Sequence, residues 1–146
     1  MFPSTGKVAE DIVFIMNKKL NREMGKYIGG MEWDIFTTLS YKNPCKEHFN
    51  RRVMENYYNK NRNLINTMFF LSERNKNFTN VHSHFLISSS SAERVMKKNK
   101  PLYKWGHIHS VMIDNNMFVT EEGVLSVGYY VTKFFEKNVD WDIFFE

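Results

Sequence analysis

The stretch of the sequence that most constrains the fold covers residues 69–91, FFLSERNKNFTNVHSHFLISSSS. Two runs rich in apolar residues flank a polar segment, which predicts two strands joined by a hairpin. If the turn is centred between Asn77 and Phe78, Glu73 falls directly opposite His82. Directly opposed residues share one face of a sheet, with Cβ atoms about 4.5–5.5 Å apart.

The returning strand of this hairpin carries two histidines, His82 and His84. Because side chains alternate along a strand, residues at i and i+2 point to the same face. Glu73 would therefore converge with both imidazoles on one patch of sheet. One carboxylate and two imidazoles, with room left for water or a phosphate oxygen, predict an open divalent-metal site.

Length and composition indicate one folded domain. The chain has 146 residues, 42% of them hydrophobic and 16% aromatic, which favours a packed globular protein over a disordered one. We expect a single domain over residues 1–146, with an N-terminal helix over about 4–25 and a core over about 31–146. The net charge of +4 is compatible with an anionic partner.

The single cysteine, Cys45, excludes an intrachain disulfide and a multi-cysteine zinc motif. It favours a reducing, intracellular compartment. No apolar run approaches the roughly 18 residues of a membrane span, so we expect no membrane partner.

Periodicity and turn signals predict the order of elements after the first helix. The predicted strands cover residues 31–41, 64–73, 81–88, 104–114 and 140–146, and the predicted helices cover residues 43–61, 90–98 and 125–138. The first six elements read βαββαβ, the split ferredoxin-like (RRM-like) arrangement. We expect an α+β fold with a central antiparallel sheet of about five strands, helices on one face and an extra N-terminal helix. The metal patch would lie on the other face.

Local signals set the expected helix boundaries. Pro44 suits the first position of the helix over residues 43–61. Ser90 and Glu93 have capping-box spacing, which starts the next helix after the serine run. Ser126 is a candidate cap for the last helix.

The last predicted helix offers two tyrosines and a lysine. Tyr129 points nearly opposite to the apolar stripe of this helix, whereas Tyr130 lies at its flank and Lys133 shares the side of Tyr130. A tyrosine beside a cation at the edge of a helix can face an open sheet surface. An ordinary amphipathic tyrosine is the structural alternative.

Three segments, in this order, resemble the motifs of HUH-superfamily endonucleases, specifically the rolling-circle replication initiators called Rep proteins. FTTLSY, residues 36–41, is similar to the first Rep motif. NVHSHFLI, residues 80–87, resembles the His-hydrophobic-His motif, and YVTK, residues 130–133, resembles the Tyr-x-x-Lys motif. Together the three segments cover most of residues 31–137.

The resemblance implies a mechanism. Glu73, His82 and His84 would hold one Mg²⁺ or Mn²⁺, which polarises the scissile phosphate of single-stranded DNA. Tyr130 would attack phosphorus as a covalent nucleophile, leaving a 5′-phosphotyrosine and a free 3′-OH. Lys133 would stabilise the developing negative charge. The implied partners are single-stranded or hairpin origin DNA and a replication helicase.

Two departures from the family pattern leave alternatives open. Ser83 stands between the histidines where the family prefers a hydrophobic residue. His107 and His109, in GHIHSV, fit the His-hydrophobic-His wording better and are the alternative ligand pair. The first pair is preferred because it has an opposed glutamate. Tyr129 is the alternative nucleophile.

Binding of single-stranded DNA needs aromatic platforms and backbone contacts. The candidates are Phe36, Thr37, Thr38 and Tyr41 in the first motif, and Arg74 and Lys76 near the hairpin. Core packing or solvation is the alternative for each of them. Two other functions remain open: a transposase or relaxase with the same chemistry, and a non-catalytic ferredoxin-like module that binds nucleic acid.

Overall fold

The computed structural model of the chain describes residues 19, 22–74, 80–113, 117–120, 123–126 and 140–145, with side chains for all but 117–120 and 123–126. The chain forms two compact units. The sheet unit comprises Glu32–Phe118 and Val139–Glu146, and the N-terminal unit comprises Met1–Met31 and Val119–Asn138. The fold is α+β, and the described residues form a five-stranded antiparallel sheet and three α-helices, including the N-terminal one.

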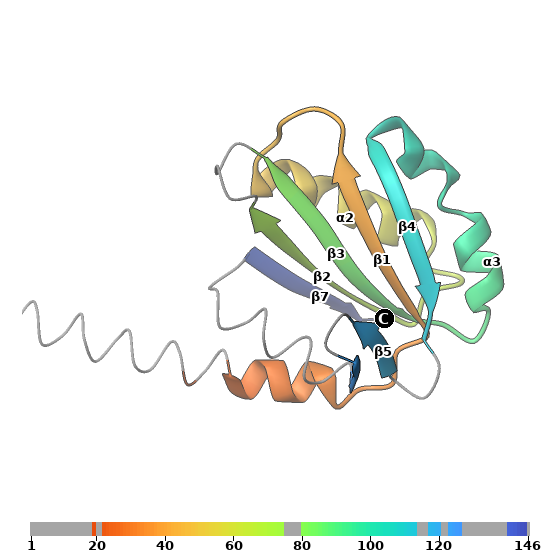
Figure 1. Ribbon diagram of the computed structural model, residues 1–146. Coiled ribbons are helices and arrows are strands. Elements are labelled where there is room, and N and C mark those ends of the chain that lie inside the picture. The colour runs from red at the N-terminus through yellow and green to blue at the C-terminus, as the bar shows by residue number, and fades with distance from the viewer. Residues whose placement is uncertain are drawn as a thin grey trace, which may run out of the picture. The chain divides into compact units, whose positions relative to one another are not determined.

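The sheet unit is built on five strands in the order β4-β1-β3-β2-β7, with every neighbouring pair antiparallel (Figure 1). The strands are β1 (Ile35–Tyr41), β2 (Thr67–Arg74), β3 (Val81–Ser88), β4 (Gly106–Met112) and β7 (Asp140–Phe145). The predicted bounds of β3 are confirmed. The prediction that β1 and β3 are neighbours inside the sheet is also confirmed, and β7 is an edge strand as expected.

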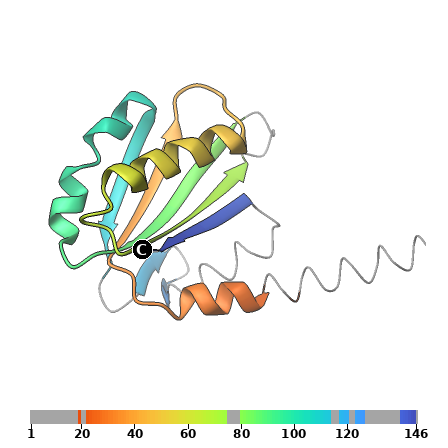
Figure 2. The ribbon, with the colours of Figure 1, turned by 180° about the vertical axis from the view of Figure 1, so that it is seen from behind.

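Two α-helices and a 3-10 helix lie on one face of this sheet. They are α2 (Glu47–Lys60), α3 (Ala92–Lys97) and the 3-10 helix η1 (Lys100–Lys104). Figure 2 shows α2 in front of the sheet and α3 beside β4. The apolar side of α2 packs on side chains that alternate along β1, β2 and β3 and are buried together with it. This core includes Ile35, Leu39, Val53, Met54, Tyr57, Tyr58, Met68, Phe70, Phe85 and Ile87.

Helix starts are the local feature that the sequence predicted least well. The helix α2 begins at Glu47, not at Pro44. Residues 42–46 form a loop instead, in which the Cys45 amide donates to the Asn80 side chain at 3.0 Å. The cap of α3 is Ser91, which makes no side-chain cap bond, so the capping box of Ser90 and Glu93 is wrong.

In the N-terminal unit, Lys19 is helical and a helix runs through residues 22–29, past the predicted end near residue 25. Separate from the five-stranded sheet, a two-stranded sheet pairs β5 (Met117–Thr120) with β6 (Gly123–Ser126), and this hairpin was not predicted. Ser126, the expected helix cap, is the last residue of β6, and Leu125 is also in that strand. The rest of that predicted helix, with Tyr129, Tyr130 and Lys133, lies outside the described residues.

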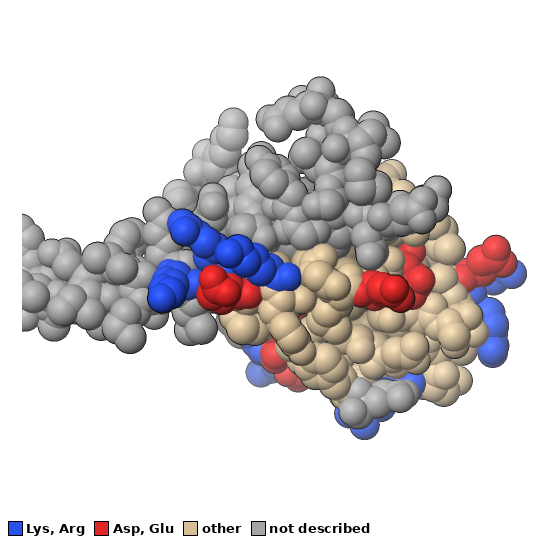
Figure 3. Space-filling model, turned by 90° about the horizontal axis from the view of Figure 1, so that it is seen from below, with Lys and Arg blue, Asp and Glu red and all other residues tan. Residues whose placement is uncertain are grey.

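The described side chains carry both signs of charge. On the face drawn in Figure 3, Lys and Arg side chains occur together with Asp and Glu side chains, so the net charge of +4 is the balance of a mixed surface. Within the described ranges, no helix is long and apolar enough to cross a membrane.

Candidate functional site

The hairpin formed by β2 and β3 brings one carboxylate to two imidazoles. Glu73 pairs directly with His82, as the sequence predicts, and His84 pairs with Leu71. Ser83 and Phe85, the neighbours of His84, are buried on the side of the helices. Because side chains alternate, Glu73, His82 and His84 lie on the opposite face of the sheet. All three side chains are half-buried there.

The second histidine pair lies on the same face. Ser40 of β1 pairs with His82 on one side and with His107 of β4 on the other. In the next row Thr38 pairs in the same way with His84 and His109. The two histidine pairs are therefore two strands apart, about 10 Å at the usual strand spacing. The sequence reasoning did not place both pairs on one face.

We call this surface the histidine face and define it by seven residues. They are Glu73, His82, His84, His107, His109, Thr38 and Ser40. The two histidines of β4 are exposed, whereas those of β3 are half-buried. One row further along the sheet, Phe69 and Leu86 are almost fully buried. Glu73 and the four histidines thus lie at the end of the sheet where β1 ends and β3 begins.

The imidazole of His84 is positioned by two neighbours on β1. Thr38 Oγ1 lies 3.1 Å from His84 Nδ1, within hydrogen-bond distance. The Phe36 ring lies parallel to the imidazole, with ring centroids 6.0 Å apart and planes 7° apart. If Nδ1–H donates to Thr38, the lone pair needed by a metal is on Nε2. Thr38 is therefore suited to fix the tautomer of a ligating histidine.

The donor types on the histidine face fit a divalent cation. A strand glutamate and imidazoles at i, i+2 are ligands that Mn²⁺ and similar ions accept. In the part of the chain that the structure describes, however, no three His, Cys, Asp or Glu side chains form a finished ligand set. The backbone register places Glu73, His82 and His84 on one face. To bind a metal, their side chains would have to turn toward one another.

The predicted DNA contacts divide between the two faces of β1. Thr38 belongs to the histidine face, and Phe36 lies on the same side of the sheet, one row further along. Thr37 and Tyr41 do not lie on this side, because alternate residues of a strand point to opposite sides. Thr37 is 0% exposed and its hydroxyl is 2.8 Å from that of Ser110, so the DNA role expected for it is corrected.

Tyr41 is 6% exposed and its hydroxyl donates to Asn50 Oδ1 at 2.7 Å. Burial, with a smaller contribution from Cys45, raises the pKa of this phenol above its usual range. Tyr41 therefore lies on the helix side of the sheet, and its contact with DNA stays a prediction.

Arg74, another predicted DNA contact, is paired with a carboxylate. Its Nη2 donates to Glu47 Oε2 at 2.8 Å, and its Nε donates to the other oxygen of the same group. The hydrogen bonds from Arg74 lower the pKa of Glu47. The guanidinium is exposed, but a phosphate would compete with Glu47 for it. Lys76, the remaining candidate, lies outside the described residues.

A cation on α2 that the sequence treats as a solvated surface residue has a defined role in the structure. Arg51 Nη1 donates to Asp142 at 2.6 Å, and Nη2 donates to Asp140 at 2.9 Å. Burial alone would lower the pKa of Arg51, but hydrogen bonds and charges from the two aspartates raise it. The pairing ties β7 to α2, and no local sequence signal shows it because the partners are about 90 residues apart.

Ser83 lies between the two histidines of β3, on the buried side of the strand. The side chain points into the core at 0% exposure, and its hydroxyl has no hydrogen-bond partner among the described residues. We expect Ser83→Ala to raise the free energy of unfolding by about 1 kcal/mol, because a buried hydroxyl without a partner is costly. Urea denaturation measures this, with Ser88→Ala, which faces the other side of β3, as the control. A loss of stability in Ser83→Ala would contradict the prediction.

Comparisons with protein-family models, with curated proteins and with solved structures found no match. The class of protein is therefore defined by its fold and its site alone. It is an α+β protein whose antiparallel sheet carries helices on one face and, on the other, four histidines and a glutamate at one end.

Proposed function

We propose that the protein is an HUH-type endonuclease of the Rep class, which nicks and rejoins single-stranded DNA to initiate rolling-circle replication. One observation carries the proposal. The strand β3, inside the sheet, presents His82 and His84 on the face opposite the helices, and Glu73 is directly opposite His82. The resemblance implies Glu73, His82 and His84 as the ligand set. The pairing of β2 with β3, which does not depend on the resemblance, brings the same three residues to one face.

The topology supports the proposal. The elements β1, α2, β2, β3, α3 and β4 follow the order βαββαβ, and the corresponding strands stand in the order β4-β1-β3-β2. This order supports a ferredoxin-like (RRM-like) fold, in which the face opposite the helices is the one that binds a ligand. In this fold the histidines of β3 occupy the middle of that face.

A divalent ion, Mg²⁺ or Mn²⁺, would supply Lewis-acid polarisation of the scissile phosphate when bound. Glu73, His82 and His84 would hold it, and Thr38 would keep the His84 ring oriented. His107 and His109 lie across β1 from this set, without an opposed carboxylate among the described residues. As exposed donors on the same face, they are suited to contact the DNA backbone.

The covalent chemistry is assigned to Tyr130 from its motif alone. Its phenol oxygen would form a bond to phosphorus while the bond from phosphorus to the 3′ oxygen breaks. The phenol proton leaves and the departing 3′ oxygen is protonated, which gives a 5′-phosphotyrosine and a 3′-OH. Lys133 would stabilise the negative charge of this step. The phosphodiester energy is kept in the covalent bond, so the reverse reaction rejoins the ends.

Trapping of the covalent adduct tests the proposal. The full chain is incubated with a randomised single-stranded DNA pool and Mn²⁺, and protein–DNA adducts are resolved by denaturing electrophoresis. We expect an adduct that EDTA prevents, that Tyr130→Phe abolishes and that Tyr129→Phe retains. Because the metal needs both imidazoles, His82→Ala should lower the adduct yield at least about tenfold. His107→Ala, on the same face, distinguishes the histidine pair of β4 from that of β3.

Other outcomes would reassign the site. An adduct that ignores EDTA or survives His82→Ala unchanged would remove the metal role from β3. Loss in His107→Ala with persistence in His82→Ala would move the site to β4. If no divalent ion yields an adduct while single-stranded DNA still binds, the protein is a non-catalytic nucleic-acid-binding module. Loss of the Mn²⁺ electron paramagnetic resonance signal on addition of protein measures metal binding independently of cleavage.

A further inference from the structure

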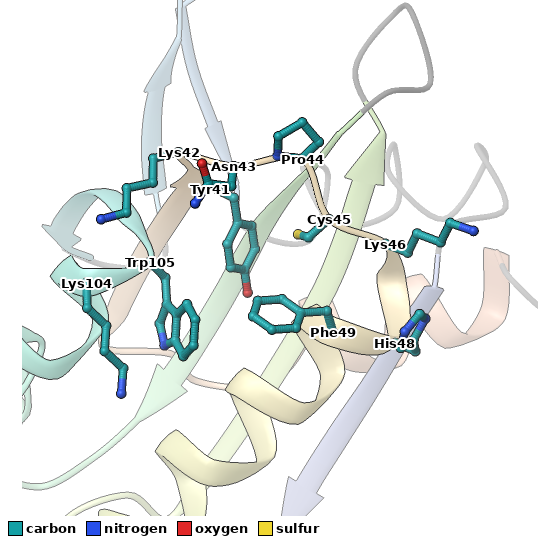
Figure 4. Close-up of a pocket in the computed structure, with 10 residues that line it drawn as sticks. All are labelled: Tyr41, Lys42, Asn43, Pro44, Cys45, Lys46, His48, Phe49, Lys104 and Trp105. Carbon is teal, nitrogen blue, oxygen red and sulfur yellow. The ribbon is translucent and has the colours of Figure 1, made fainter.

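A pocket of about 420 Å³ lies at the end of β1, in the sheet unit (Figure 4). Its walls come from the last residue of β1, the loop that follows, the first turn of α2 and the end of η1. This volume is in the range of small-molecule sites. The lining residues are Tyr41, Lys42, Asn43, Pro44, Cys45, Lys46, His48, Phe49, Lys104 and Trp105.

The inner wall of the pocket is aromatic. The Phe49 ring stands between two others, with its centroid 5.9 Å from that of Tyr41 and 5.1 Å from that of Trp105. The Phe49 and Trp105 planes meet at 83°, an edge-to-face contact. Figure 4 shows the three rings gathered at the centre of the site. Since Phe49 and Trp105 are only half-buried, they offer a planar ligand an aromatic surface.

The rim of the pocket is basic. Lys42, Lys46 and Lys104 are exposed and line it, and no carboxylate is among the described lining residues. Glu47, next to Lys46 in the chain, holds its carboxylate in the pair with Arg74. The lysine charges are therefore not neutralised by it. The Lys104 ammonium lies 4.9 Å from the centre of the Trp105 ring, which places a cation beside the aromatic surface.

The loop that forms the rim is fixed by hydrogen bonds. The Lys42 amide donates to the Trp105 carbonyl at 3.0 Å. The Asn80 side chain accepts from the Cys45 amide at 3.0 Å and donates to the Tyr41 carbonyl at 3.2 Å. A pocket whose walls are already held in place loses little conformational entropy when it binds a ligand.

From this combination we infer that the pocket binds one nucleotide. The base stacks against Trp105 beside Phe49, and the phosphate meets the lysines of the rim. A planar ring joined to an anion satisfies both halves of the pocket, whereas an uncharged aromatic compound or inorganic phosphate satisfies only one half. The nucleotide can be a free mononucleotide or one unit of a single strand, and the experiment below separates these sources.

The position of the pocket favours a unit of a single strand, a step that rests on the proposed function. Ser40, in the histidine face, and Tyr41, in the pocket wall, are consecutive residues of β1. The two sites are thus at the same end of the sheet, on opposite faces. A strand that crosses this end would place one base in the pocket and a neighbouring phosphate near the histidines.

Fluorescence anisotropy of a labelled oligothymidylate of about 15 nucleotides, the upper end of single-strand site sizes, tests the inference. EDTA is present throughout, so the result does not depend on cleavage and is separable from failure of the proposed function. We expect Trp105→Ala to weaken binding roughly tenfold, as loss of one stacked base does. Tyr103→Ala removes an aromatic side chain that is 58% exposed and outside the lining, and should bind as wild type.

The lysines are tested by the salt dependence of the same titration, which keeps the inference falsifiable if Trp105→Ala fails to fold. Replacing Lys42, Lys46 and Lys104 by glutamine should reduce the slope of log K against log salt by about 0.7, the contribution of the one phosphate that these lysines contact. Lys97→Gln, on α3 and outside the pocket, should leave the slope unchanged.

The sources are distinguished by competition and by an abasic strand. If thymidine monophosphate displaces the oligonucleotide and binds Trp105→Ala more weakly than wild type, the source is a free nucleotide. If it does not compete but an abasic oligonucleotide binds about tenfold more weakly than the normal one, the source is the strand. If thymidine monophosphate does not compete, equal binding of the abasic strand would overturn the inference. Equal loss of binding in Tyr103→Ala and Trp105→Ala would overturn it in either case.

Discussion

Replacing Gly106 with alanine should lower the free energy of unfolding by about 3 kcal/mol, the upper end of the range for overpacking. A Cβ atom at this position would lie 2.0 Å from the Ser40 carbonyl oxygen and 2.9 Å from Tyr41 Cα. Both are backbone atoms of β1, which pairs on its other side with β3. The overlap can be relieved only if β4 moves away, because no flexible side chain can yield.

Urea denaturation measures the loss, and hydrogen exchange of the β4 amides locates it. Gly30→Ala is the matched control, because its added Cβ would lie 3.2 Å from the nearest backbone atom and should cost much less. Next to Gly106, the Trp105 carbonyl accepts a hydrogen bond from the Lys42 amide, and both residues line the pocket. Gly106→Ala should therefore also weaken oligonucleotide binding. Stability within about 0.5 kcal/mol of wild type would show that the two strands approach less closely than described.

Asn50→Ala should lower the free energy of unfolding by about 3 kcal/mol, because it leaves the buried hydroxyl groups of Tyr41 and Ser72 without their partner. Asn50 is 0% exposed on α2, accepts from the Tyr41 hydroxyl and donates to Ser72 Oγ at 2.7 Å. It thereby links the helix to β1 and β2 through the core. Asn56→Ala, the same change at an exposed position of α2, should alter stability by no more than about 0.5 kcal/mol.

A double-mutant cycle separates loss of hydrogen bonds from loss of volume. In Tyr41→Phe the hydrogen bond between Tyr41 and Asn50 is already absent. Asn50→Ala should therefore lower the free energy of unfolding by less in that background than in the wild type. Strict additivity of the two changes would mean that the Tyr41–Asn50 bond contributes nothing, and that the cost of Asn50→Ala comes from the cavity alone.

The hairpin of β2 and β3 could be predicted because its signals are local. Period-two alternation fixed the faces of His82 and His84, and the turn position fixed the partner of Glu73. The same alternation in residues 36–41 separates Phe36 and Thr38 from Thr37 and Tyr41. The DNA contact expected at Thr37 ignored this separation, so a signal that could have corrected it was present in the sequence.

Other features depend on contacts that a sequence pattern does not carry. The pairing of Arg51 with Asp140 and Asp142 joins residues about 90 positions apart. The start of α2 was misplaced because Pro44 suits a helix, whereas its loop is fixed by a distant side chain, Asn80. The strands β5 and β6 have four residues each, too few for alternation to distinguish them from a turn.

The register also bears on the order in which the sheet can assemble. Pairing β2 with β3 closes loops of at most 21 residues (Thr67 to Ser88), whereas Tyr41 and Gly106 are 65 residues apart and Thr67 and Phe145 are 78 apart. Closing a longer loop costs more chain entropy, and this cost arises before the strands make stabilising contacts. Pairings between distant residues therefore form more slowly. Glu73, His82 and His84 therefore belong to the part of the sheet whose pairing can form early. Ser40, Thr38 and the histidines of β4 can join them only through pairings of much higher contact order.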